Sequence, residues 1–227
     1  MPNRSLLVRH LLFVAGAILL SSTSGSAQSV DTVVSNRLGS SSAEIWVGYS
    51  PTSTSAGVLG RHGDVSLGLV GMRFNRRIRA LETKFVYYSF DAIPVARVTP
   101  LIVYSGDAAK VCPGPYYDCR RITTVARGVG FNPIGVTVIT QGNPRVQWRL
   151  GATGGALIFD RRTPSDLASR FNFTAAIEAG VQWVNADGKG WTLVYHLHHL
   201  SNAGTAEDNL AMLSHVISIG GRWRVSR

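Results

Sequence analysis

The sequence predicts an all-β protein, an eight-stranded antiparallel transmembrane β-barrel of the outer-membrane type. Three observations favour this fold. Apolar residues recur with a period of two far more often than with the helical period. Aromatic residues stand near the ends of the apolar faces, as they do in the interfacial girdles of membrane barrels. The opposite faces carry Gly, Ser, Thr, Gln and charged residues. A soluble secreted β-sandwich would also alternate, and it predicts a mature protein that dissolves without detergent.

Composition limits the alternatives further. The 227 residues are 45% hydrophobic and 16% charged, with 24 Gly. This apolar content excludes an intrinsically disordered chain. An apolar stretch of the roughly 18–20 residues that a membrane-spanning helix requires is missing, so a helical membrane protein is excluded as well. The length suits one domain.

Residues 1–27 have the features of a secretory signal peptide, which leaves residues 28–227 as the β-barrel domain. Two Arg residues precede a short apolar core, Leu11 to Leu20, and Gly25-Ser26-Ala27 supplies small residues for cleavage. An anchoring helix is the alternative, but the core is short for one. Removing this segment, which holds two Arg and no acids, lowers the formal charge from +10 to +8. A basic exported chain of this kind favours a phosphate-rich lipid surface over nucleic acid as its partner.

Runs of alternating residues define the expected strands, in chain order. They span residues 43–50, 64–75, 79–90, 122–140, 145–158, 171–184, 190–201 and 211–225. The run 122–140 is long enough to require a bend or a bulge. Gly142-Asn143-Pro144 and Asn185-Ala186-Asp187-Gly188 are turn sequences between strands. A further extended run covers 95–105, and residues 160–169 could hold a short helical turn limited by Pro164.

The two faces of the later strands differ in character. Glu178, Gly180 and Gln182 alternate with apolar neighbours, and Ser and Arg residues alternate with Leu213, Ile217 and Ile219 in the last strand. The aromatic residues expected at the membrane interfaces are Trp148, Trp183, Trp191 and Trp223.

Cys112 and Cys119 are the two cysteines of the sequence, and a Pro/Gly turn separates them. In an exported chain this spacing suggests a small structural disulfide loop. A metal site would need more ligands nearby than the segment offers.

The segment from Trp191 to Asn209 is the richest in reactive side chains. In an extended strand, His199 and Ser201 continue the apolar face that begins at Trp191, with their Cα atoms about 7 Å apart. An imidazole within reach of a serine hydroxyl can take its proton during nucleophilic attack. Asn202, Ala203 and Gly204 follow as a turn that could aim N–H groups at an oxyanion. The plain alternative is a polar turn that closes a hairpin.

Two other groups of residues have competing interpretations. His196 and His198 form an inward pair that could bind a metal, but hydrogen bonding among lumenal polar groups is the commoner use of such residues. Arg76 and Arg77 are expected in a hairpin, where a solvated turn is favoured over a site for lipid phosphates.

The run His199-Leu200-Ser201-Asn202-Ala203-Gly204 resembles the His-x-Ser-Asn-Ala motif of the lipid A 3-O-deacylases, the PagL-like outer-membrane family. Ser50-Pro51, Phe131-Asn132-Pro133 and Arg170-Phe171-Asn172-Phe173 are similar to weaker landmarks of that family. The resemblance implies an eight-stranded barrel in the bacterial outer membrane whose active site faces the lipid. It further implies hydrolysis of the ester that holds the acyl chain at position 3 of lipid A in lipopolysaccharide, without metal or cofactor.

By this motif, Ser201 would be the nucleophile and His199 its general base, with Asn202, Ala203 and Gly204 as oxyanion candidates. The family also has an acidic residue, a Glu, that this sequence lacks. When residues are counted without gaps from Ser201, the position of that Glu is occupied by Leu213. Glu207 and Asp208 are the candidate substitutes, and Asn209 or His215 could act by hydrogen bonding. The rival expectation is a non-catalytic outer-membrane barrel, a structural or lipid-binding relic of the family. The sequence leaves a homodimer open.

Overall fold

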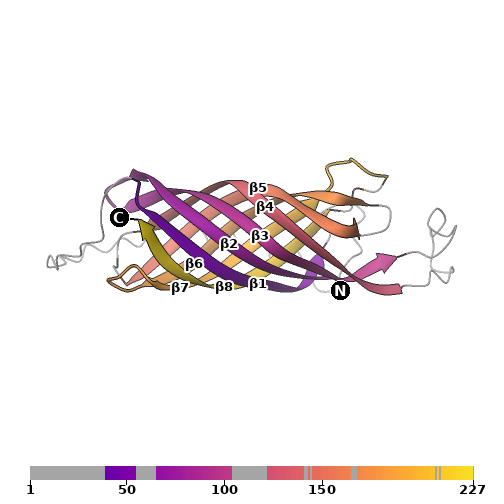
Figure 1. The fold of residues 1–227 in the computed structure, drawn as a ribbon, viewed down its shortest axis with the longest axis horizontal. Helices are drawn as coiled ribbons and strands as arrows, with labels where there is room; N and C mark the ends of the chain where they lie inside the picture. Colours follow the sequence, from indigo (N-terminus) through magenta and orange to yellow (C-terminus); the bar gives the residue numbers. More distant parts are fainter. Residues whose placement is uncertain are drawn as a thin grey trace, which may run out of the picture. The chain divides into compact units, whose positions relative to one another are not determined.

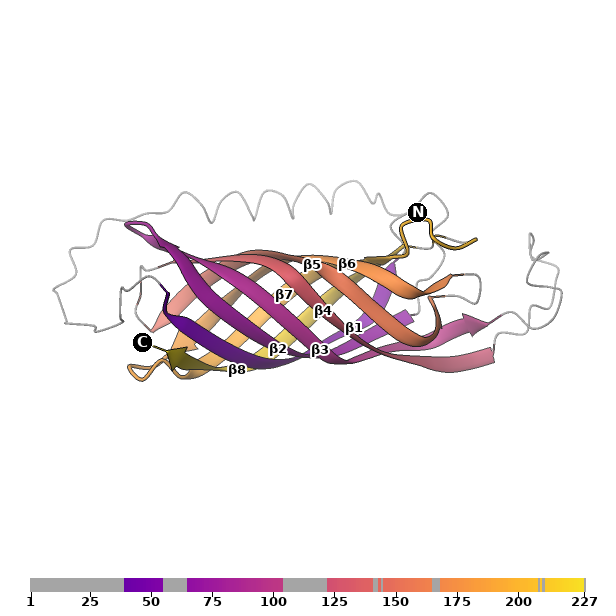
Figure 2. The same cartoon turned by 45° about the horizontal axis from the view of Figure 1, so that its top comes forward.

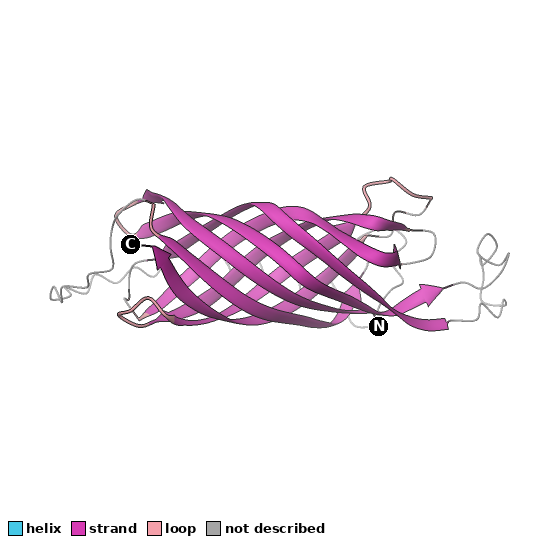
Figure 3. Cartoon of the chain, in the orientation of Figure 1, coloured by secondary structure: helices cyan, strands magenta, loops and turns pink. Residues whose placement is uncertain are grey.

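The computed structural model describes residues 39–54, 65–103, 122–140, 143, 145–164, 168–207, 209 and 211–226. Throughout this part of the chain the regular structure is β-strand (Figure 3). None of the described residues belongs to a helix long and apolar enough to cross a bilayer. The expected signal peptide, the Cys112–Cys119 pair and residues 165–167 of the expected helical turn lie outside the described residues. The described part of that turn is not helical, because residues 160–163 belong to β-strand and a new strand begins at Ser169.

Eight antiparallel strands form one closed barrel, in which each strand pairs with the next and β1 pairs with β8 (Figures 1 and 2). The strands are β1 Ser41–Thr54, β2 Val65–Ala80, β3 Lys84–Val103, β4 Ile122–Thr140, β5 Val146–Thr163, β6 Ser169–Val184, β7 Gly190–Ser201 and β8 Met212–Ser226. Closure leaves no unpaired sheet edge, so every strand backbone can be satisfied inside a membrane. The predicted fold class is therefore confirmed.

The two ends of the barrel differ in their connections. Short turns at residues 81–83, 141–145 and 185–189 join strands at the end where β1 begins and β8 ends. The other four connections lie at the opposite end, the longer ones at 55–64, 104–121 and 202–211 and a short one at 164–168. In outer-membrane barrels the short turns face the periplasm and the longer loops face outward. We call these the periplasmic end and the outer end.

Two expected strands match the structure in both bounds, 122–140 as β4 and 190–201 as β7. The bend expected in 122–140 is also present, because the pairing of β4 with β5 shifts register between Phe131 and Ile134. The other strands of the structure extend beyond their predicted bounds at one end or both, as in β5, which continues to Thr163 through part of the expected helical turn.

The boundary between β2 and β3 was predicted wrongly. The hairpin turn is at Leu81–Lys84, where the two residues exchange backbone hydrogen bonds, and not at Arg76-Arg77. Arg77 lies within β2 with its side chain in the lumen, 3.8 Å over the Phe85 ring and hydrogen bonded to the Tyr87 hydroxyl. The run 95–105 is not a separate strand, since β3 continues through it to Val103.

Four Trp residues lie on the consecutive strands β5 to β8 near the periplasmic end of the outer surface. Trp148 stands near the start of β5, and Trp183 pairs directly with Trp191 across β6 and β7. Trp223 occupies the end of β8. All four side chains are exposed, as expected for aromatic residues at a membrane interface.

The lumen is filled by side chains. Near the outer end it holds an apolar cluster that includes Val65, Leu67, Val98, Leu200 and Met212. The middle of the lumen holds a network of buried ion pairs. Arg73 bonds to both Asp91 and Glu178, and Arg149 bonds to Glu44 at 2.9 Å.

Candidate active site

Strand β7 directs His199 and Ser201 outward, toward the lipid, near the outer end of the barrel. Exposure alternates strictly along the strand, with Thr192, Val194, His196, His198 and Leu200 buried in the lumen. His199 and Ser201 therefore belong to the outer face that begins at the exposed Trp191. This is the direction that alternation in the sequence predicts.

The neighbours of this pair on the barrel surface are apolar. Across β6, Ala175 lies beside His199 and Phe173 lies beside Ser201. Phe173 also packs edge-to-face with Phe171, with the ring centroids 5.1 Å apart. Ala175 presents only a methyl group beside the half-buried His199, while the two Phe rings give Ser201 an apolar flank. The pair can thus meet an acyl chain from the side.

No hydrogen bond joins His199 to Ser201 in the described part of the chain, although the two side chains share a face at a spacing of two residues. Catalytic hydrogen bonds are often long in a free enzyme and tighten only when substrate is bound. The arrangement brings a base and a hydroxyl to one surface and leaves the final contact to a rotamer change.

The turn after Ser201 is tight and strained. The N–H of Thr205 donates to the Asn202 carbonyl at 3.1 Å, and both Ala203 and Gly204 have positive φ, at 53° and 79°. This is the pattern of a type I′ turn, in which Ala203 occupies a conformation that favours glycine. The buried Asn202 side chain accepts the Gly204 N–H at 2.9 Å, so that amide is already used within the turn.

The residue opposite His199 on β8 is Leu213. The register thus identifies Leu213 as the position from which a carboxylate on β8 would face the imidazole. Of the two predicted substitutes, Glu207 is exposed in the connection between β7 and β8, and Asp208 lies outside the described residues. Asn209 is exposed in the same connection.

A second polar pair lies on the same outer face. The Tyr195 hydroxyl and His215 Nδ1 are 2.6 Å apart, joining β7 to β8 one row of side chains below His199. Alternation alone puts both residues outward, but their contact depends on the β7–β8 register, which the sequence does not state. His215, expected as a hydrogen-bonding substitute for the acid, is instead hydrogen bonded to Tyr195, a partner that the sequence analysis did not predict.

The two inward histidines lie in different surroundings. His196 contacts Ser218 Oγ at 2.7 Å, lies 3.4 Å from Glu178 and stacks on Trp46. His198 is buried, and within the described part of the chain its ring nitrogens have no hydrogen-bond partner. Among the described residues, no three His, Cys, Asp or Glu side chains gather as a metal site would require.

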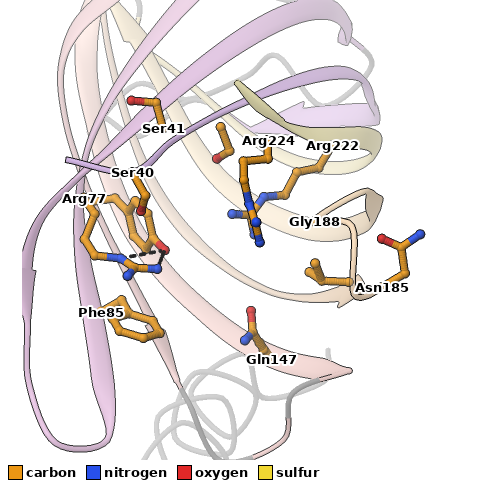
Figure 4. Close-up of a pocket in the computed structure, with 12 residues that line it drawn as sticks. Ser40, Ser41, Arg77, Phe85, Gln147, Asn185, Gly188, Arg222 and Arg224 are labelled. Carbon is orange, nitrogen blue, oxygen red and sulfur yellow. Dashed lines mark hydrogen bonds between the residues drawn. The ribbon is translucent and has the colours of Figure 1, made fainter. Parts of the chain in front are cut away.

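A separate small cavity, of about 50 Å³, lies at the periplasmic end of the lumen (Figure 4). Arg77, Arg222 and Arg224 line it together with Ser42 and Gln147. It contains none of the predicted site residues and lies at the opposite end of β7 from Ser201. The candidate active site is therefore an open surface of the barrel and not a pocket in its lumen.

Comparison with known proteins agrees with the sequence motif. The family model described as lipid A 3-O-deacylase (PagL) matches residues 103–222, just over half of the chain. This range contains β7 with His199 and Ser201, the turn that follows, and most of β8. No curated protein is similar enough to this chain to count as a match.

Several solved barrels are also similar. The crystal structure of the outer-membrane enzyme PagL is 16% identical, with a TM-score of 0.49, over 81% of this chain and 99% of that one. Ail of Yersinia pestis in a phospholipid bilayer nanodisc is 12% identical, with a TM-score of 0.39 and coverage of 82% and 99%. AlkL is 10% identical, with a TM-score of 0.41 and coverage of 90% and 97%. At these values the barrel assignment depends on the strand pairing of this chain itself.

Proposed function

Because the chain belongs to the lipid A 3-O-deacylase (PagL) family of the bacterial outer membrane, we propose that it is an esterase that removes the 3-O-linked acyl chain from lipid A. The observation that carries this proposal is the outward direction of His199 and Ser201 near the outer end of β7. Lipid A resides in the outer leaflet, so its ester groups approach the barrel from the side at this depth.

The reaction begins with attack by Ser201 Oγ on the carbonyl carbon of the ester. His199 accepts the hydroxyl proton as the new C–O bond forms. The resulting oxyanion needs N–H donors, and the turn after Ser201 is the nearest source of them. Since the Gly204 amide already donates to Asn202, we assign this role to the main-chain N–H of Ala203, with Asn202 and Gly204 holding the turn.

The tetrahedral intermediate then collapses and the sugar oxygen leaves with the proton from His199. The acyl chain stays on Ser201 as an ester. A water molecule, deprotonated by His199, attacks this acyl-enzyme and releases the fatty acid, with the proton returning to Ser201. The whole cycle uses two side chains of β7 and a main-chain N–H of the turn that follows, and it calls for no metal or other cofactor.

The imidazolium formed in each step is stabilised by a nearby negative charge in enzymes of this type. We propose that Glu207 or Asp208, from the connection between β7 and β8, supplies part of this charge in place of the residue at Leu213. The second candidate function is a non-catalytic barrel, and it is favoured by one observation, the direct pairing of the apolar Leu213 with His199.

Mass spectrometry of lipid A after incubation with the detergent-purified protein tests the proposal. We expect loss of one 3-hydroxyacyl chain with the wild-type protein, and a rate lower by roughly 10²- to 10⁴-fold with Ser201→Ala and with His199→Asn. Ser41→Ala, the same truncation at the periplasmic end of β1, is the matched control and should keep the wild-type rate.

The outcomes separate the candidate functions. Deacylation that survives both Ser201→Ala and His199→Asn would show that the assignment of these residues is wrong. If the folded wild-type protein removes no acyl chain, the proposed esterase function is wrong and the non-catalytic function takes its place.

A further inference from the structure

A groove of about 500 Å³ runs along the outer surface of β3, β4 and β5, away from His199 and Ser201. Its floor includes Pro94, Val95, Val129 and Ile158, and the last three are each about half exposed on the lipid-facing side. A second hollow of about 220 Å³ shares Pro94, Val129 and Ile158 with it and continues toward the periplasmic end. Together they form one long apolar depression, which we call the β3–β5 groove.

An irregularity of the sheet accounts for this depression. The pairing of β3 with β4 shifts register between Ile93 and Ala96, and Pro94 and Val95 are the residues of the bulge. A bulge bends its strand and locally increases the twist, and Pro94 cannot donate to the ladder. The sheet is therefore hollowed at a fixed place.

Two arginines mark the outer end of the groove. Arg97 on β3 and Arg127 on β4 are direct cross-strand partners, and both side chains are exposed. Partners in an antiparallel pair have Cα atoms about 4.5–5.5 Å apart, and like charges at such positions repel. An arrangement of this kind at a membrane surface is stabilised by an anion that both guanidinium groups can bind.

The charges around this pair remain positive overall. Asp160 also lines the groove, but its carboxylate accepts the main-chain N–H of Arg127 at 3.0 Å and lies 3.5 Å from Arg161. The charged groups here are thus the guanidinium groups of Arg97, Arg127 and Arg161 and one carboxylate, that of Asp160. The strand directions place the Arg97–Arg127 pair, the basic head of the groove, nearer the outer end of the barrel. The apolar floor lies deeper in the membrane.

We propose that the β3–β5 groove binds a lipid A molecule of the outer leaflet, with a phosphate on Arg97 and Arg127 and an acyl chain along Val95, Val129 and Ile158. A basic head above an apolar floor complements a phosphorylated, acylated glycolipid. At about 4.8 Å per strand, the groove's nearest strand, β5, is about 10 Å around the barrel from β7, and its middle strand, β4, is about 14 Å away. Binding here is independent of the chemistry at Ser201, so the site holds lipid whether or not the proposed esterase is active.

Native mass spectrometry of the full-length protein tests this site, with Ser201→Ala in every sample so that no lipid is consumed. The probe is diphosphorylated lipid A, compared with the same lipid after removal of its phosphates and with phosphatidylglycerol. We expect Arg97→Gln/Arg127→Gln to weaken retention of diphosphorylated lipid A by roughly 10- to 30-fold, since each guanidinium near an anionic lipid surface contributes about fivefold. Val129→Trp, which fills the floor, should weaken it with both arginines present.

The matched control is Arg76→Gln/Arg79→Gln, which removes the same charge from exposed positions near the periplasmic end of β2 and should leave retention unchanged. Equal retention by Ser201→Ala barrels with and without Arg97→Gln/Arg127→Gln would overturn the proposal. Equal retention of the dephosphorylated lipid or of phosphatidylglycerol would overturn lipid A phosphate as the occupant. Because every sample lacks Ser201, none of these results depends on whether the protein is an esterase.

Discussion

Leu213 is the residue at which this barrel departs from the Ser/His/acid arrangement that the proposed mechanism would use. It lies directly opposite His199, where a carboxylate would orient the ring and stabilise the imidazolium. A leucine can do neither, and it offers the imidazole only an apolar contact. The cost of such a change is usually several orders of magnitude in rate, while the nucleophile and base persist.

Restoring a carboxylate at this position should raise the rate of lipid A deacylation. We expect Leu213→Glu to accelerate the reaction by roughly 10²-fold or more, because the new carboxylate faces the imidazole across one strand pair. The measurement is the initial rate of fatty-acid release from lipid A in detergent micelles.

Ile217→Glu is the control for this variant. It introduces the same acid on the outer face of β8, opposite Tyr195 instead of His199. It should leave the rate unchanged. Equal acceleration by both variants would contradict a specific role for position 213.

The direction of the site residues could be predicted from the sequence, but their partners could not. Strict alternation from Trp191 to Ser201 fixes the faces of β7, because the strand has no bulge in its pairing with either neighbour. Contacts between strands need the register as well. The Tyr195–His215 bond and the Arg97–Arg127 pair both depend on it, and for the second pair the register shifts in β3 make counting from the sequence fail.

At the scale of elements, Glu178 of β6 connects strands on opposite sides of the lumen. Its carboxylate binds Arg73 of β2, lies 3.6 Å from Arg149 of β5 and faces His196 of β7. The side chains of the two arginines and of Glu178 are almost fully buried. A lost partner would leave guanidinium charge without compensation inside the barrel.

Glu178→Ala should therefore lower the free energy of unfolding by about 3–5 kcal/mol. The measurement is urea-induced unfolding in lipid vesicles, followed by tryptophan fluorescence. Glu82→Ala removes the same charge from the exposed turn between β2 and β3 and should change the value by less than about 0.5 kcal/mol. Equal effects of the two substitutions would mean that the lumenal network contributes no net stability.

Strand boundaries could be predicted where the period of two runs unbroken between turn sequences, as in β7. The predicted strand boundaries are wrong where a bulge or a buried charged residue interrupts the alternation. The bulge at Pro94 and Val95 makes β3 look like two strands, since the apolar face changes parity there. Arg76-Arg77 looks like a charged turn, yet Arg77 is inside the barrel because Phe85 and Tyr87 give its guanidinium a ring to stack on and a hydroxyl to bond.

At the scale of the whole molecule, buried side chains from opposite strands meet across the lumen of the described barrel. The apolar cluster lies toward the outer end, and the ion pairs of Arg73 and Arg149 cross the middle. Eight-stranded barrels have an interior that side chains can fill.

The purified protein should therefore produce no stepwise ionic current in a planar lipid bilayer, even at molar salt. A general porin of 16 strands serves as the positive control for the measurement. Discrete current steps that grow with salt concentration would contradict a filled lumen.

The outward direction of the His199 and Ser201 side chains determines how a lipid reaches them. A residue that faces the side of a membrane barrel meets molecules that diffuse in two dimensions, within the one leaflet that reaches its depth. The quantity that governs encounter with His199 and Ser201 is therefore the mole fraction of a lipid in that leaflet and its lateral mobility. A membrane that is stiffer, or whose lipids are more tightly cross-bridged, will slow the encounter of lipids with His199 and Ser201, even when every residue of the barrel stays the same.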